Sequence, residues 1–150
     1  MKHSVQGMAV ATAAAFLYLS CASGASAATT RANRAPSWNL IGRSASDIHE
    51  LDVNSVRSVD TEVFSARVRS TPTKLGRAKF ARENSGATSQ IDALYIDCGV
   101  RQYSIISITW YRDARVIRVS NFLDDIQFNE TREGSIGEAQ VDSVCATQGL

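Results

Sequence analysis

Alternation of apolar and polar residues dominates the chain from Trp38 onward. It is clearest over residues 61–71, where Phe64, Ala66 and Val68 share one face and serine and arginine side chains take the other. A period of two is typical of a β-strand with one face on a core and one in solvent, because successive side chains point to opposite sides of the sheet. This segment is expected to be an antiparallel strand.

Short connections at residues 99–102 and 112–115 have hairpin length, so the strands that they join are expected to be neighbours in a meander. The candidate strands besides 61–71 are residues 38–42, 48–53, 54–59, 91–98, 103–111 and 116–123, with a turn at 52–55. The residues expected to share a face are Leu94, Ile96 and Cys98 in one strand and Ile106, Ile108 and Trp110 in the next.

The pattern changes period near the C-terminus. Ser135-Ile136-Gly137-Glu138 matches a capping box, in which the serine and glutamate side chains satisfy backbone donors at a helix start. After it, Val141, Val144 and Cys145 recur at helical spacing. The expected fold is α+β: an antiparallel β-sheet of about six strands with a C-terminal α-helix packed against it.

Residues 1–27 resemble a secretory signal peptide. Met1-Lys2-His3 gives a positive start, an apolar run follows, and Ala25-Ser26-Ala27 forms an A-x-A cleavage site. The apolar run is shorter than the roughly 20 residues of a membrane span, and no later segment reaches that length. Residues 28–37 are expected to be a disordered leader and 38–150 a single domain. Cleavage before Cys21 as a lipoprotein is a less favoured alternative, so the predicted location is the periplasm, the cell surface or the medium.

After cleavage, Cys98 and Cys145 are the remaining cysteines, and in an oxidising compartment two thiols normally pair. A disulfide between them would tie the helix to the sheet. It would close a loop of 47 residues and remove about 4 kcal/mol of denatured-state freedom. A free thiol or a metal ligand is the alternative, although one histidine and two cysteines do not complete a structural zinc site.

The chain without residues 1–27 is formally neutral, because Lys2 is lost from 16 basic residues and 15 acidic residues remain. Nucleic acid is therefore not an expected partner. A local exception is the segment 72–82, PTKLGRAKFAR, which is either a solvated loop or a positive patch for an acidic glycan, a lipid headgroup or an acidic protein. The candidate binding residues in it are Lys74, Arg77, Lys79, Phe80 and Arg82.

A second basic set would line the outer face of the sheet if the strands pair as expected. Its members are Arg67, Arg69, Arg101, Arg112 and Arg118, with Asp97 and Asp113 as neighbours of opposite sign. Strand registers do not follow from one sequence, so this surface is a geometric conjecture.

Candidate catalytic chemistry is sparse. His49 is the one histidine after residue 27, so a hydrolase would have to use it, with Asp47, Glu50 or Asp52 as its partner. The pair Asp124-Asp125 lacks the spacing of a calcium loop and is expected to end a strand. We predict no catalytic residue, no metal site and no cofactor.

The segment 95–145 resembles the surface-adhesin protein E-like family of bacterial envelope proteins. The resemblance rests on IDCGVRQYSIIS, WYRDARVIRVSN and REGSIGEAQVDSVC, preceded by a strand with Trp38 and Ile41, and covers about 110 residues. The family usually has a tryptophan where this chain has Ile126-Gln127-Phe128, and a glycine in the turn where it has Asp113-Ala114. The resemblance implies an antiparallel sheet, a flanking helix and a disulfide, with adhesion known for the namesake.

The expected function is a non-enzymatic, exported binding domain of the bacterial envelope that contacts a macromolecular partner through the basic loop or an exposed sheet face. The alternatives are a small secreted hydrolase centred on His49 and a periplasmic inhibitor or accessory subunit. Exposed edge strands would also allow a homodimer through edge pairing.

Overall fold

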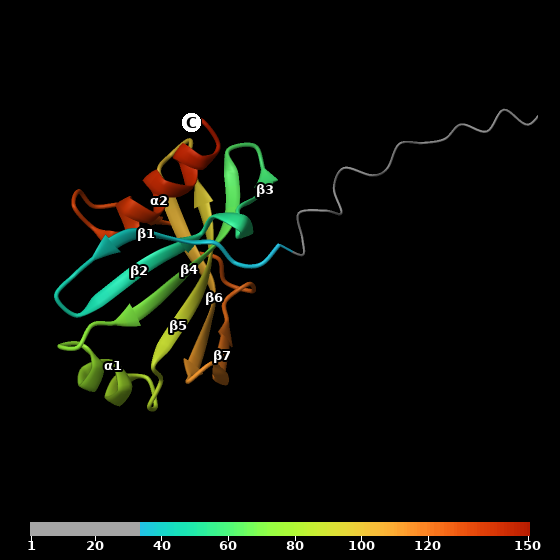
Figure 1. Cartoon of the computed structure of the whole chain (residues 1–150). Helices are drawn as coiled ribbons and strands as arrows, with labels where there is room; N and C mark the ends of the chain where they lie inside the picture. Colours follow the sequence, from blue (N-terminus) through green and yellow to red (C-terminus); the bar gives the residue numbers. More distant parts are fainter. Residues whose placement is uncertain (1–33) are drawn as a thin grey trace, which may run out of the picture.

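The computed structural model describes residues 34–150; the predicted signal peptide, Cys21 and residues 28–33 of the predicted leader lie outside the described residues. The described part is an antiparallel sheet with helix α2 (Ile136–Thr147) on one face, which confirms the predicted α+β class (Figure 1). The strands are β1 (Trp38–Arg43), β2 (Asp47–Asp52), β3 (Arg57–Asp60), β4 (Val63–Pro72), β5 (Ser89–Asp97), β6 (Gln102–Arg112), β7 (Arg115–Asn121) and β8 (Asn129–Glu130).

Six strands form the main path of the sheet, in the order β1-β2-β4-β5-β6-β7, and all neighbouring pairs run antiparallel. The two short strands are additions, because β3 pairs with β4 and β8 pairs with β6. The meander predicted for the last three long strands is confirmed as β5-β6-β7. None of the helices in residues 34–150 is long and apolar enough to cross a membrane.

The core lies between α2 and the sheet. On β4, Phe64, Ala66 and Val68 are buried as their alternation predicted, and Leu94 and Ile96 of β5 lie directly beside them in the register. The helix contributes its predicted stripe, since Val141, Val144 and Cys145 belong to the same buried cluster.

The predicted disulfide is present. Cys98 follows β5 and Cys145 lies in the last turn of α2, with an S–S distance of 2.05 Å and a Cα–Cα distance of 5.7 Å. The helix start also agrees with the capping box: the Ser135 hydroxyl accepts a hydrogen bond from the Glu138 N–H at 3.1 Å. The Glu138 carboxylate accepts from the Gly134 N–H at 2.7 Å, one residue before the cap.

Two local predictions need correction. Ile106, Ile108 and Trp110 do not share one face throughout, because a bulge opposite Ala93 and Leu94 inserts Ile106 and brings Ile105 opposite Leu94. The predicted strand 54–59 is also wrong at its start: residues Val53–Ser55 form a short 3-10 helix (η1), and β3 begins at Arg57. Asp52 caps this turn by accepting from the Asn54 N–H, which an Asp commonly does ahead of a helical turn.

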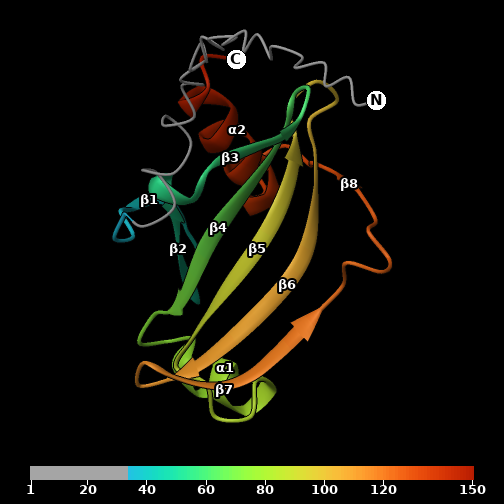
Figure 2. The ribbon, with the colours of Figure 1, turned by 90° about the vertical axis from the view of Figure 1, so that its right-hand side faces the viewer.

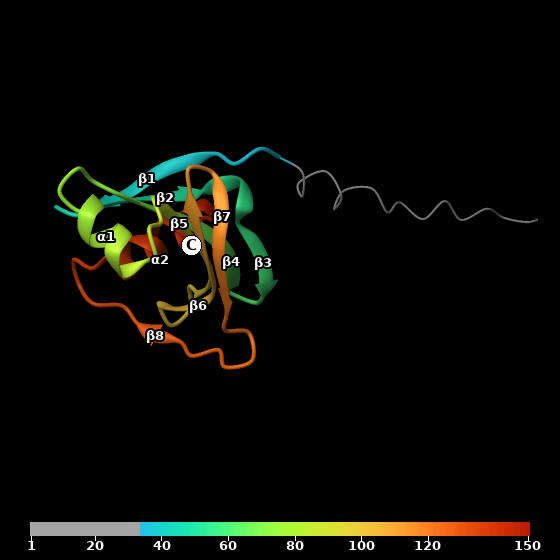
Figure 3. The same ribbon diagram turned by 90° about the horizontal axis from the view of Figure 1, so that it is seen from below.

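The molecule has two distinct ends along its strands. Helix α2 packs on the end that carries the β3–β4 turn, and the short helix α1 (Arg77–Glu83) lies beyond the opposite end, below the sheet in Figure 1. Figure 2 shows β4, β5 and β6 curving from one end of the molecule to the other. Figure 3 views the molecule from the end at which α1 lies.

Candidate functional site

The segment 72–82, expected to be a loop, contains helix α1, and this is a correction. The chain leaves β4 at Pro72, and the Thr73 N–H donates to the Ser46 carbonyl of the β1–β2 turn at 2.7 Å. The Gly76 backbone lies so close to Ser46 that a Cβ there would come within 2.0 Å of the Ser46 carbonyl oxygen. Only glycine fits this approach, so the start of α1 is fixed against the β1–β2 turn.

The C-terminal end of α1 is fixed to β6, which β4 and β5 separate from β1 and β2 in the sheet. The Trp110 indole N–H on β6 donates to the side-chain oxygen of Asn84 at 3.0 Å. The Arg112 guanidinium donates to the carbonyls of Ser85 and Gly86 at 2.6 and 2.9 Å. α1 therefore bridges the β1–β2 turn and the end of β6, which explains why seven residues, too few for an isolated helix, form one here.

The basic patch, defined as Lys74, Arg77, Lys79 and Arg82, lies on this segment. All four side chains are exposed, and none lies within 4.0 Å of a carboxylate among the described residues. Leu75, between two of them in sequence, is 83% exposed, whereas Phe80 is half-buried. Four cations without carboxylate partners beside an exposed leucine form a positive surface with a small apolar element.

The same end of the molecule is positive as a whole. We define the α1 pole as residues 73–88 with the β1–β2 and β6–β7 turns, which flank them. Its cations are Arg43, Lys74, Arg77, Lys79, Arg82, Arg112 and Arg115, and its carboxylates are Asp47, Glu83 and Asp113. At the opposite end, the β3–β4 and β5–β6 turns carry Asp60, Glu62 and Asp97, and Arg101 there pairs with Asp142. A chain that is close to neutral overall thus separates its charge between its two ends.

The second basic set does not form one surface, so this conjecture is wrong. Arg67 and Arg69 lie on the sheet face opposite α2, where they pair with Asp52 and Glu50 at 2.5 and 2.8 Å. Arg118 stacks on the Trp110 ring at 3.6 Å from its centre. It pairs directly with Trp110 in the β6–β7 register, so both lie on the α2 face of the sheet and not on the face of Arg67 and Arg69. The remaining two, Arg101 and Arg112, lie at the turns already described.

His49 lies on β2, half-buried, with its Nδ1 2.9 Å from the Ser70 hydroxyl of β4. Burial lowers the pKa of the imidazole, and the nearby Asp47 carboxylate partly opposes this shift. Of the three predicted acidic partners, Asp47 is on the face of His49, whereas Glu50 and Asp52 are on the opposite face and pair with arginines. Ser70 is only 5% exposed, so a substrate has little access to its hydroxyl.

A second polar pair lies beside Ser70. Asp92 of β5 is 7% exposed and accepts from the Gln90 amide at 3.0 and 3.2 Å. Burial raises the pKa of Asp92 to about 6, and the hydrogen bond from Gln90 offsets part of the shift. Alternation alone marks Gln90 and Asp92 as core-facing, but the sequence gives no sign that a carboxylate would be buried there.

The remaining carboxylates have local roles. The Asp97 side chain accepts from the Gly99 and Val100 N–H groups in the β5–β6 turn. Asp124 and Asp125 are exposed and follow the end of β7 at Asn121 by three and four residues, so they do not end the strand as expected. In residues 34–150, no group of three or more His, Cys, Asp or Glu side chains is placed to hold a metal ion.

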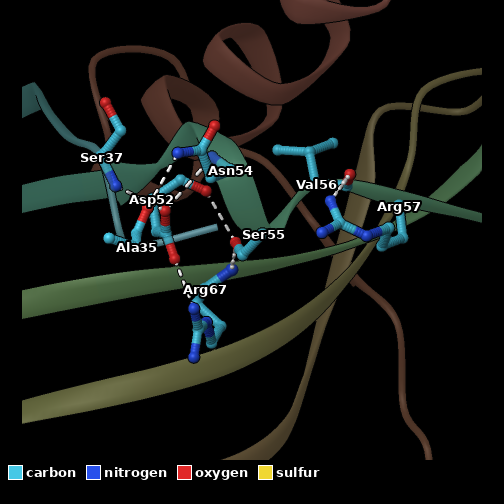
Figure 4. Close-up of polar contacts among 8 residues, drawn as sticks. All are labelled: Ala35, Ser37, Asp52, Asn54, Ser55, Val56, Arg57 and Arg67. Carbon is cyan, nitrogen blue, oxygen red and sulfur yellow. Dashed lines mark hydrogen bonds and ion pairs between the residues drawn. The ribbon is translucent and has the colours of Figure 1, made fainter. Parts of the chain in front are cut away.

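Asp52 anchors the start of the domain on the face opposite α2. It is fully buried and accepts from the Ser37 N–H at 2.9 Å, from the Asn54 N–H at 3.2 Å and from Arg67 at 2.5 Å (Figure 4). The Asn54 amide donates to the Ala35 carbonyl at 2.8 Å. Residues 35 and 37, at the end of the predicted leader, are therefore held against η1.

Comparison with family models, curated proteins and solved structures finds no match to this chain. The resemblance to the surface-adhesin protein E-like family stays a prediction.

Proposed function

We propose that this chain is an exported, non-enzymatic binding domain of the bacterial envelope and that its α1 pole binds an acidic macromolecular partner. The observation that carries the proposal is the basic patch: Lys74, Arg77, Lys79 and Arg82 are exposed and have no carboxylate of residues 34–150 within 4.0 Å. Cations that the protein does not neutralise itself are available to a ligand. The two-sided anchoring of α1 supports the proposal further, because a pre-ordered surface loses less entropy on binding.

The exposed Leu75 gives the patch a small apolar contact beside the charges. An acidic glycan, an anionic lipid headgroup and an acidic protein all present negative groups that suit such a surface. All three candidate partners are negatively charged, so each of them is expected to bind at the α1 pole.

The test replaces all four patch cations with Gln and measures retention on immobilised heparin and on anionic vesicles as a function of salt. We expect the wild type to be retained at low salt on at least one of the two, and the variant to elute earlier with a flatter salt dependence. Retention of the variant equal to that of the wild type would rule out this surface. A matched pair compares Arg82→Gln with Arg101→Gln, which removes the same charge in the β5–β6 turn at the opposite end of the molecule.

Export is tested on the same protein in its own cell. We expect intact-mass analysis of the fractionated protein to give a chain that begins at Ala28. A lipidated chain that begins at Cys21 would indicate the lipoprotein alternative, and an uncleaved cytoplasmic chain would contradict export. Affinity capture from the native envelope would separate a periplasmic inhibitor or accessory subunit from a protein that binds material outside the cell.

The hydrolase is the second candidate function, because one observation favours it: the hydrogen bond between His49 and Ser70, with Asp47 on the same face. A neutral imidazole beside a serine hydroxyl is the arrangement that activates a serine nucleophile. A serine-reactive fluorophosphonate that labels Ser70 in the wild type but not in His49→Ala would support it. No labelling and no activity in a broad hydrolase panel would leave this pair as a structural contact.

A homodimer is the remaining expectation. The outer edge of β7 has no strand partner among the described residues, and Val116 and Val119 on it are 49% and 52% exposed. Light scattering after size-exclusion chromatography, on wild type and on Val119→Lys, decides between a dimer that the lysine disrupts and a monomer.

A further inference from the structure

A hollow lies at the edge of β6, on a part of the molecule that the proposed function does not use. It has a volume of about 240 Å³ and is bounded by β6 and by the chain between β7 and β8, which stands out from the sheet edge (Figure 2). Ile105, Ile108 and Phe122 supply its apolar lining, and Asp125 is among its polar residues. The volume is below the range of about 300–1,000 Å³ that is usual for small-molecule pockets, so the hollow suits a side chain of a macromolecular partner.

The chain beside the hollow exposes apolar side chains. We call residues 122–128, which connect β7 to β8, the apolar loop. Four of the twelve exposed large hydrophobic residues among residues 34–150 lie in these seven positions: Phe122, Leu123, Ile126 and Phe128, with exposures of 41, 54, 40 and 40%. An exposed apolar cluster is typical of a protein interface, in which aromatic side chains are enriched. The apolar loop is therefore a candidate docking surface.

Negative charge surrounds the apolar loop. Residues 122–133 contain four carboxylates and one arginine, Arg132, which gives a formal charge of −3. Each carboxylate is exposed, and none lies within 4.0 Å of a lysine or arginine nitrogen among residues 34–150: Asp124, Asp125, Glu130 and Glu133. A partner that is complementary to this surface carries cations beside an apolar side chain.

The basic patch of the same chain has both features. Its four cations have no carboxylate partner among the described residues, and Leu75 beside them is the most exposed large hydrophobic residue of residues 34–150, at 83%. Helix α1 is anchored at both ends, so the patch is presented as an ordered surface. Within one copy, the described residues form no ion pair between the patch and residues 122–133, so both surfaces are left for a second copy.

We infer that the basic patch of one copy docks on the apolar loop of another, with Leu75 in the hollow and the patch cations against the carboxylates of residues 122–133. The inference rests on the proposed function, because it identifies the acidic partner of the α1 pole as a second copy of this chain. The two surfaces are different, so each added copy leaves one of each unoccupied and association continues into a ring or an open chain. Because the contact relies on exposed charges, high salt weakens it.

The first experiment is sedimentation velocity of the purified protein over a concentration series, at low and at high salt. At low salt we expect the weight-average sedimentation coefficient to rise with concentration, and at high salt we expect it to return toward the monomer value. A protein that stays monomeric at every concentration at low salt would overturn the inference. A dimer that Val119→Lys abolishes would overturn it as well, because that dimer uses the β7 edge.

Charge reversal locates the two surfaces. Lys79→Glu with Arg82→Glu reverses charge in the basic patch. Asp124→Lys with Asp125→Lys reverses charge in the apolar loop. Each variant alone should associate about tenfold more weakly than the wild type or worse, because like charges then face each other. An equimolar mixture of the two should recover association, since the reversed patch meets the reversed loop and the native patch meets the native loop; no recovery would refute the contact.

The control for net charge is Asp60→Lys with Glu62→Lys. These residues lie at the β3–β4 turn, outside both surfaces, and their reversal makes the same change of charge as reversal of the apolar loop. The control should associate like the wild type. Association that falls equally in the control and in the loop variant would show that net charge alone governs it, which would also refute the contact.

Variants without a change of charge separate this inference from the proposed function. Ile126→Ser with Phe128→Ser should weaken association about tenfold through the loss of apolar burial, yet elute from heparin with the wild type, because the apolar loop lies outside the α1 pole. Retention of the wild type on heparin without any self-association would refute the second copy and leave the proposed function standing. Association that persists in the variant with four Gln in the patch would refute the inference, whatever that variant does on heparin.

Discussion

One face of this sheet has two halves that differ in chemistry although they lie on the same strands. Under α2, β4 presents Phe64, Ala66 and Val68, and β5 presents Leu94 and Ile96, all buried. Further along the same face, toward α1, β4 presents Ser70 and β5 presents Asp92 and Gln90. On β4 and β5 the alternation continues but the residues become polar toward α1, whereas β6 keeps Ile108 and Trp110 opposite Asp92 and Gln90.

The difference shows what each half depends on. The α2 half is held by apolar burial and a covalent bond, neither of which involves a titrating side chain. The α1 half is held by hydrogen bonds, such as those from Trp110 to Asn84 and from Arg112 to Ser85. We therefore expect large losses of stability from changes in the first half and small or pH-dependent effects in the second.

The largest expected effect comes from the disulfide. The double variant Cys98→Ser with Cys145→Ser should lose about 4 kcal/mol of unfolding free energy, because the denatured chain regains the freedom of a 47-residue loop. Urea denaturation monitored by tryptophan fluorescence measures it. Reduction of the wild type should reproduce the loss, and a reductant should have no effect on the variant; a loss below 1 kcal/mol would mean that the helix is held by its apolar stripe alone.

A leucine in each half gives the next comparison. Leu94→Ala should cost about 2–5 kcal/mol, because Leu94 has 0% exposure and its truncation leaves a cavity under α2. Leu75→Ala should stay within about 0.5 kcal/mol, because Leu75 is 83% exposed. The same urea experiment compares them. Similar losses in both would show that the α1 segment packs more tightly than its exposure indicates.

Most of the α2 half was predictable from sequence, because apolar alternation, a capping box and paired cysteines are local signals. The faces of β4 and β5, the start of α2 and the disulfide follow from them. The α1 half was not. Helix α1 exists because Gly76 meets Ser46 and Asn84 meets Trp110, contacts between residues distant in sequence that depend on strand register.

The candidate sites divide in the same way. The basic patch was visible as a cluster of cations in sequence, and its exposure agrees with the pattern. The contact of His49 with Ser70 and the hollow lined by Ile105, Ile108 and Phe122 join residues from separate strands and loops, so no sequence spacing indicates them. The bulge at Ile106 likewise changes which side chains of β6 share a face, and no glycine or proline within the strand indicates it.

The pH dependence of stability tests the polar half. The pKa of Asp92 is about 6 in the folded protein and near 3.8 unfolded, so between these values the folded state holds a proton that the unfolded state has lost. The contribution of Asp92 to stability is therefore full below about pH 4 and falls by up to about 3 kcal/mol as the pH rises to 6. Asp92→Asn should remove this fall, seen as a difference from the wild type between pH 4 and 7.

The control for that measurement is Asp124→Asn, which changes an exposed carboxylate and should follow the wild-type pH profile. Other carboxylates also titrate in this range, so the difference between the two variants isolates Asp92. Parallel profiles for wild type and Asp92→Asn would show that Asp92 remains ionised in the fold.

The smallest expected effect is a gain, in the β6–β7 turn of the α1 pole. Asp113 and Ala114 have φ angles of 49° and 66°, a left-handed conformation that costs a residue with a Cβ about 1–2 kcal/mol. Ala114→Gly relieves this cost but adds about 0.4–1 kcal/mol of denatured-state entropy, so the net gain should be about 0.5 kcal/mol. Ala139→Gly, within α2, should instead lose about 1 kcal/mol, because a helix interior disfavours glycine. Urea midpoints that move in opposite directions for these two substitutions would show that the left-handed conformation at Ala114 is strained, and a loss for both would mean that the turn conformation carries no cost.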